Sequence, residues 1–331
     1  MKTFLRILAT AFSASLGLVA GVAPQKLVHL YGRLVGMALV SVAFAGCTSV
    51  APRSWELPSD VKVLTTNGYA MAYVERGQGA PLVLVHGTLG DYRNWEPVMP
   101  MLSSHFRTIS VSLRHAYPEP WNGQGNDAAI AQHAADLAAF IRALGIGPVH
   151  LLGHSRGGAV VLLTASAHPE LVRSVILADP APFVTLLPDR PEVQAAEEKR
   201  TAISQSMLER FQKGDLDGGA ALWINAVGGP GAWAAASATS QGIWRSNAWT
   251  AKTLVDDDRQ PFHCNDAARI TAPVLLITGD RSPPIYGYMQ EGLRPCLKQV
   301  TNAVIANAGH GMFRANPKAF SERVAEFVAD H

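Results

Sequence analysis

The six residues Gly153-His154-Ser155-Arg156-Gly157-Gly158 carry the clearest chemical signal in the sequence. A serine flanked by glycines at this spacing is typical of a sharp turn between a strand and a helix, because the turn is tight and the serine backbone is strained. Such a turn lifts the serine hydroxyl above a sheet, where it can act as a nucleophile. The backbone amide of Arg156 would then open the helix and could stabilise an oxyanion.

A serine of this kind needs a base and an acid that orients the base. Asp280 ends the apolar segment 275–279, and His310 lies in a loop after the next apolar segment. Both should reach the sheet edge that carries Ser155, so we expect His310 as the base and Asp280 as the acid. Asp179, which follows the preceding apolar segment, remains an alternative acid, with Asp280 then capping a helix.

The oxyanion requires a second amide donor, and Thr88 is the expected source. It follows His86-Gly87 at the end of an apolar segment, where a strand would close. His86 and His154 belong to motifs that position backbone, so we interpret both as structural. The three cysteines are too few and too scattered for a zinc site, and we expect neither a metal nor a cofactor.

Apolar segments with the length of buried strands alternate with helical patterns from residue 61 onward. This alternation predicts an α/β fold, with a doubly wound and mostly parallel sheet covered on both faces. One stretch, about 181–262, shows no strand pattern and holds four of the seven tryptophans. We interpret it as a helical cap, inserted in the domain that spans 61–331, over the carboxyl ends of the strands.

The composition separates a leader from this domain. The chain has 331 residues, 48% hydrophobic and 16% charged, which excludes global disorder. Its net charge of +2 gives no reason to expect a nucleic-acid partner. Residues 1–46 contain four basic residues, no acidic residue and two apolar runs, as in an export signal or membrane segment. Residues 47–60 are polar and contain proline, so they suit a tether.

The leader ends in Ala43-Phe44-Ala45-Gly46 directly before Cys47, which resembles the lipobox of bacterial lipoproteins, although Phe44 departs from the usual leucine. This resemblance implies lipidation of Cys47 and a lipid-anchored protein that faces the periplasm. Ordinary secretion and a plain N-terminal membrane anchor are the alternatives. In an oxidising compartment, Cys264 and Cys296 could form a disulfide or remain two buried thiols.

Taken together, the serine, histidine and aspartate motifs resemble the α/β-hydrolase superfamily over about residues 61–331, most closely its capped epoxide-hydrolase, haloperoxidase and esterase relatives. The resemblance implies Ser155 as nucleophile, His310 as base and Asp280 as acid, with the Thr88 and Arg156 amides as the oxyanion hole. Epoxide hydrolases use an aspartate nucleophile and cap tyrosines. Here a serine occupies that position, and the predicted cap has no tyrosine.

We therefore expect a serine hydrolase that cleaves a carboxylic ester or lactone of a small, mainly apolar substrate through an acyl-enzyme intermediate. Carbon–carbon bond hydrolysis and cofactor-free perhydrolysis would use the same residues. A different class of function, a non-catalytic ligand-binding lipoprotein, would retain the fold without the chemistry. The expected partners are this substrate and the membrane, and the oligomeric state is not readable from the sequence.

Overall fold

The computed structural model of the chain describes residues 57–255 and 260–331. The expected export signal (1–46), most of the expected tether and the lipidation candidate Cys47 lie outside the described residues, so these expectations stay predictions. Within the ranges that the structure describes, no helix has the length and hydropathy needed to cross a membrane.

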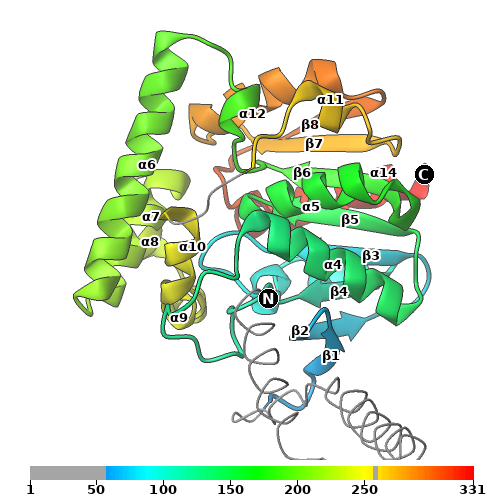
Figure 1. Cartoon of the computed structure of the whole chain (residues 1–331), viewed down its shortest axis with the longest axis horizontal. Helices are drawn as coiled ribbons and strands as arrows, with labels where there is room; N and C mark the ends of the chain where they lie inside the picture. Colours follow the sequence, from blue (N-terminus) through cyan, green and yellow to red (C-terminus); the bar gives the residue numbers. More distant parts are fainter. Residues whose placement is uncertain (1–56, 256–259) are drawn as a thin grey trace, which may run out of the picture. The chain divides into compact units, whose positions relative to one another are not determined.

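The domain is built on an eight-stranded sheet with the strand order β1-β2-β4-β3-β5-β6-β7-β8. In this order, the six strands from β4 through β3 to β8 pair in parallel. The strands β1 and β2 add an antiparallel edge. This confirms the predicted α/β sheet (Figure 1). The strands are β1 (Lys62–Thr66), β2 (Tyr69–Arg76), β3 (Pro81–Val85), β4 (Arg107–Val111), β5 (Val149–His154), β6 (Val172–Ala178), β7 (Val274–Gly279) and β8 (Val300–Ile305).

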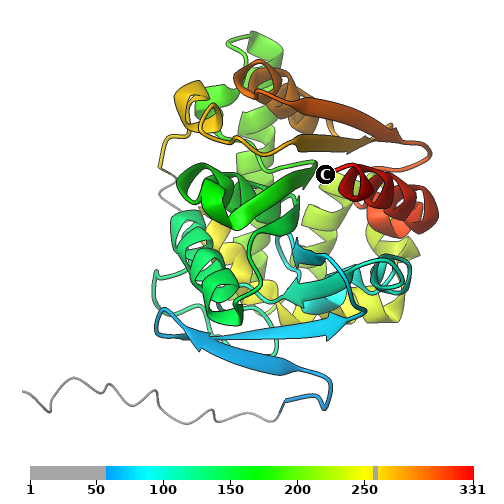
Figure 2. The same cartoon turned by 90° about the vertical axis from the view of Figure 1, so that its right-hand side faces the viewer.

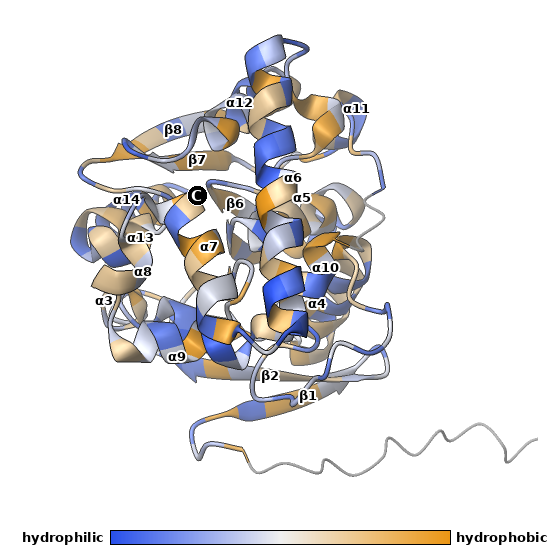
Figure 3. Ribbon diagram, turned by 90° about the vertical axis from the view of Figure 1, so that its left-hand side faces the viewer, coloured by the Kyte–Doolittle hydropathy of each residue, from blue (hydrophilic) through white to orange (hydrophobic). Residues whose placement is uncertain are grey.

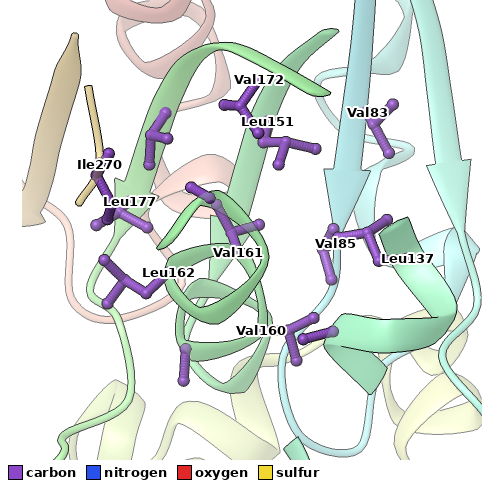
Figure 4. Close-up of a cluster of buried hydrophobic side chains, with 14 of the residues drawn as sticks. Val83, Val85, Leu137, Leu151, Val160, Val161, Leu162, Val172, Leu177 and Ile270 are labelled. Atoms are coloured by element: carbon purple, nitrogen blue, oxygen red, sulfur yellow. The ribbon is translucent and has the colours of Figure 1, made fainter. Parts of the chain in front are cut away.

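Helices cover both faces of the sheet, which explains why its central strands are apolar at consecutive positions. The helices α4 (Ile130–Leu144) and α5 (Arg156–Ala167) lie on one face, and α14 (Pro317–Ala329, red in Figure 2) lies on the other. Alternate residues of each strand enter two separate apolar cores. The core beneath α4 and α5 includes Val83, Val85, Leu137, Leu151, Val160 and Leu177 (Figure 4).

Among the described residues between β6 and β7, the α-helices from Pro191 to Val255 lie where the sequence predicts a cap. They are α6 (Pro191–Gln212), α7 (Leu216–Gly228), α8 (Ala232–Ala235), α9 (Ala238–Ser246) and α10 (Lys252–Val255). Figure 1 places them along one edge of the sheet, and Figure 3 views the molecule from their side. Trp223 and Trp244 form an apolar cluster with residues of α6, and this cluster also includes Leu89 from the loop after β3. The cap is thereby packed onto the sheet domain.

A disulfide joins Cys264 at the start of α11 (Cys264–Ala267) to Cys296 at the end of the short helix η5 (Arg294–Cys296). The Cα atoms of the two cysteines lie 4.9 Å apart. This confirms the pairing that the sequence leaves open. The bond connects the segment that returns from the cap to the segment that precedes β8.

We predict that Cys264→Ser lowers the free energy of unfolding by about 3 to 4 kcal/mol. The disulfide closes the loop from Cys264 to Cys296, and opening this loop increases the conformational entropy of the unfolded chain. Urea denaturation of the oxidised protein measures the change. Wild-type protein in dithiothreitol is the control, and it should match the variant. Equal stability of the oxidised wild type and Cys264→Ser would contradict the prediction.

Candidate active site

Ser155 occupies a strained turn between β5 and α5. Its φ of 52° and ψ of −121° lie in a region that side-chain-bearing residues rarely adopt, as the sequence motif predicts. The glycines after it are required by close packing, since a Cβ atom on Gly157 would clash with the carbonyl oxygens of Val85 and His86. The Ser155 amide donates to the Ala178 carbonyl at 3.0 Å, which ties the turn to β6.

The expected oxyanion donors lie on the two segments that meet at Ser155. A Cβ atom on Gly87 would be 2.9 Å from the Ser155 Cβ, so the loop after β3 passes directly beside the serine. Thr88 of this loop lines the same cavity as Ser155, and Arg156 begins α5. The Arg156 guanidinium donates to the carbonyls of Thr253 (3.0 Å) and Ala128 (2.7 Å). That side chain therefore holds the end of the cap in place.

The histidine at position 310 contacts a different carboxylate from the one we expected. His310 Nδ1 lies 3.2 Å from Asp179 Oδ2, and both side chains are buried. Asp179 follows β6 and has a φ of 43°. The expectation that Asp280 fills this position is wrong, and the alternative acid in the sequence occupies it.

Asp280 is exposed and caps a loop instead. Its two carboxylate oxygens accept hydrogen bonds from the amides of Asn307 and Ala308, each at 2.9 Å. These two hydrogen bonds lower the pKa of Asp280. The Asp280 carboxylate is bound by the loop that leads into His310. For this reason Asp280 does not contact the imidazole, although it follows β7.

Burial dominates the electrostatics of the contact between His310 and Asp179. Desolvation raises the pKa of Asp179 to about 7. The hydroxyl of Ser282, which donates to Asp179 Oδ2 at 2.6 Å, acts in the opposite direction and lowers this pKa. Desolvation also lowers the pKa of His310, so the neutral imidazole is favoured. An imidazole that donates from Nδ1 to a carboxylate keeps Nε2 as the proton acceptor.

Two further rings fix the orientation of His310. Tyr286 of α12 (Pro284–Leu293) stacks on its imidazole, with the ring centroids 3.9 Å apart and the planes at 13°. His154 Nε2 donates to the His310 backbone carbonyl at 2.9 Å. His86 Nε2 accepts from the Leu113 amide at 3.0 Å, which supports the structural interpretation of His86 and His154. No sequence motif marks Tyr286, because its contact depends on how α12 packs.

Ser155 and His310 line one cavity of about 460 Å³ between the sheet domain and the cap. The cap side of this cavity is mainly apolar, with Trp223 and Trp244 among its lining residues. A second cavity of about 320 Å³ lies against the other side of α7 and is lined in part by Tyr286. Among the residues described by the structure, no group of histidine, cysteine or carboxylate side chains could hold a metal ion.

Comparison with known proteins identifies the family. Residues 80–317 match the sequence profile of a family described as alpha/beta hydrolase fold. The chain belongs to this family. A curated relative of this hydrolase, (E)-2-((N-methylformamido)methylene)succinate hydrolase of Acinetobacter baylyi, is 25% identical over 275 residues, which cover 80% of this chain and 95% of the relative.

Two solved structures show the same fold as this hydrolase. A bacterial membrane phospholipase A is 22% identical, with a TM-score of 0.66 over 100% of this chain and 99% of that one. The carboxylesterase CesB from Bacillus subtilis is 20% identical, with a TM-score of 0.65 over 84% of this chain and 94% of that one. The family match identifies an enzyme with the α/β-hydrolase fold, and the two solved structures share that fold.

The hydrolase should lose far more activity in Asp179→Asn than in Asp280→Asn. We expect kcat to fall on the order of 10³- to 10⁴-fold in Asp179→Asn, because an amide neither fixes the imidazole tautomer nor stabilises its charge. Asp280→Asn should lower the melting temperature and reduce kcat by less than about tenfold. Steady-state kinetics and thermal melts of both variants measure these effects, and the reverse order of the two activities would contradict the assignment.

Proposed function

We propose that the protein is a serine hydrolase that cleaves a carboxylic ester through an acyl-enzyme intermediate. The observation that carries this proposal is the placement of Ser155 on a strained turn, in one cavity with a His310 whose Nδ1 lies against the buried Asp179. A nucleophile, a base and an orienting acid are the three parts that acyl transfer requires of side chains.

The first half of the reaction forms the acyl-enzyme. The Ser155 hydroxyl attacks the carbonyl carbon while His310 Nε2 takes its proton, and the Asp179 carboxylate stabilises the resulting imidazolium. The amides of Thr88 and Arg156 donate to the oxyanion, as the sequence suggests. Collapse of the tetrahedral intermediate expels the alkoxide, which takes the proton from His310. Water then attacks the acyl-serine while His310 Nε2 takes its proton, and collapse of the second tetrahedral intermediate releases the carboxylic acid and returns the proton to Ser155.

The size and lining of the cavity support a small, mainly apolar ester or lactone. A volume of about 460 Å³ lies in the range of pockets for small molecules, and Trp223, Ile224 and Val227 supply apolar surface. The carboxylesterase CesB is consistent with ester cleavage by this fold, and the Acinetobacter relative, by its name, hydrolyses a succinate derivative. The serine nucleophile separates this chain from an epoxide hydrolase that uses aspartate.

A fluorophosphonate probe tests the nucleophile directly, since it labels only activated serines. Wild-type protein should be labelled on the peptide that contains Ser155, and Ser155→Ala should not be labelled. Ser240→Ala is a matched control, because Ser240 lines the same cavity without lying on the turn, and this variant should still react. Absence of labelling in folded wild-type protein would refute the proposed function.

The pH dependence tests the pair formed by His310 and Asp179. Because burial raises the pKa of Asp179 to about 7, kcat/KM should fall as the pH drops through about 7, where protonation of the pair removes the base. This fall in kcat/KM reports the titration of the pair. In the residual activity of Asp179→Asn it should be absent or occur at a different pH. Full activity of the wild type at pH 5, with the protein folded, would contradict this prediction.

A further inference from the structure

One charged side chain faces the active-site cavity in the described part of the chain. Arg314, in the short helix α13 (Met312–Ala315), lines the cavity together with Ser155 and His310. The other residues that line it are glycines, residues with apolar or hydroxyl side chains, Asn94 and the two histidines. The Arg314 guanidinium is therefore the one charged group among the described residues that line this cavity.

Arg314 has no carboxylate within ion-pair distance among the described residues. Its Nη2 donates to the side-chain oxygen of Asn94, and its guanidinium lies 5.4 Å from the ring centroid of Trp244 and 5.0 Å from that of Phe313. These contacts hold the side chain in place without neutralising its charge. A guanidinium has five N–H donors, so most of them remain available to a molecule in the cavity.

Asp91, the carboxylate that raises the pKa of Arg314, already has another partner. Asp91 is fully buried, and its Oδ2 lies 2.6 Å from Arg93 Nη2 and 2.6 Å from Asn247 Nδ2. Desolvation lowers the pKa of Arg314 to about 10, against a smaller opposite effect of Asp91. Arg314 thus stays cationic at neutral pH, and no carboxylate of the described residues forms an ion pair with it, so a ligand can supply the anion.

We propose that Arg314 binds a carboxylate group of the substrate, so that the enzyme prefers esters that carry a free carboxylate over neutral esters of the same size. A carboxylate matches the planar fork of a guanidinium and carries one negative charge. A phosphate monoester carries nearly two charges, which a single cation would leave partly unpaired. The proposal rests on the proposed function, because it names the substrate class of that same cavity.

Matched substrate pairs test the preference in the purified wild-type protein. The first pair, 4-methylumbelliferyl hemisuccinate and 4-methylumbelliferyl pentanoate, places the charge on the acyl side. The second pair, 4-acetoxybenzoate and its neutral isostere 4-acetoxybenzamide, places it on the leaving group. After correction for the uncatalysed hydrolysis rates, we expect kcat/KM to favour the anionic member of at least one pair by about 10- to 100-fold, as a charged hydrogen bond provides. Equal or lower values for the anionic member of both pairs would overturn the proposal.

Substitution of Arg314 assigns the preference to this side chain. Arg314→Gln should remove the preference by raising KM for the anionic ester, so that kcat/KM falls at least about tenfold more for the anionic ester than for the neutral ester. A merely structural role would lower both substrates alike, and that result would overturn the proposal. Arg314→Lys keeps the charge without the fork and should retain part of the preference. It replaces Arg314→Gln if the neutral variant does not fold.

A surface arginine provides the matched control. Arg281 also donates from Nη2 to an asparagine side chain, Asn307, at 2.8 Å, but it is exposed and does not line the cavity. Arg281→Gln should keep the preference for the anionic ester, and its loss there would overturn the assignment to Arg314.

A binding measurement separates this inference from the proposed function. Pentanoate ion, with pentanamide as its neutral isostere, is titrated into Ser155→Ala by calorimetry, where no turnover can occur. Pentanoate should bind at least tenfold tighter than pentanamide, and Arg314→Gln in the same background should abolish the difference. Such binding with no fluorophosphonate labelling would refute the serine chemistry alone. Labelling of Ser155 without any charge preference would refute the carboxylate site alone.

Discussion

The strained backbone of Ser155 is the constraint on which the candidate active site depends. A φ of 52° is held by three contacts: the loop after β3 passes beside the serine, Gly157 of α5 lies against the end of β3, and the serine amide is bonded to β6. Strain of this kind persists only where the surrounding structure fixes it. The eight-stranded sheet and its two apolar cores provide that rigidity, and the cap then closes a cavity over the hydroxyl.

Burial sets the chemistry around this serine. Asp179 and His310 are withdrawn from water, which raises the pKa of the carboxyl and lowers that of the imidazole, and the contact between them determines which nitrogen of the imidazole faces the cavity. The stacked ring of Tyr286 and the hydrogen bond from His154 limit the movement of His310. Arg314 is the charged side chain that the described residues place in this cavity, and a substrate anion can pair with it.

Local patterns predicted the parts of the site that depend on local structure. The elbow at Ser155, the loop that holds His310 and the insertion after β6 follow from glycine spacing and hydrophobic runs. The acid was predicted wrongly because Asp179 and Asp280 both follow strands of the parallel sheet, and only the three-dimensional path shows that Asp280 binds the amides of Asn307 and Ala308. Tyr286 and Arg314 carry no motif, since their roles arise from packing between distant elements.

Trapping the acyl-enzyme tests the central claim most directly. The protein is mixed with 4-methylumbelliferyl pentanoate, quenched in acid within the first turnovers, digested and analysed by mass spectrometry. The account predicts a pentanoyl group on the peptide that contains Ser155, accompanied by a burst of methylumbelliferone stoichiometric with enzyme. A pentanoyl group on another residue, or turnover with neither a burst nor an acylated Ser155 when chemistry is slowed at low temperature, would contradict it.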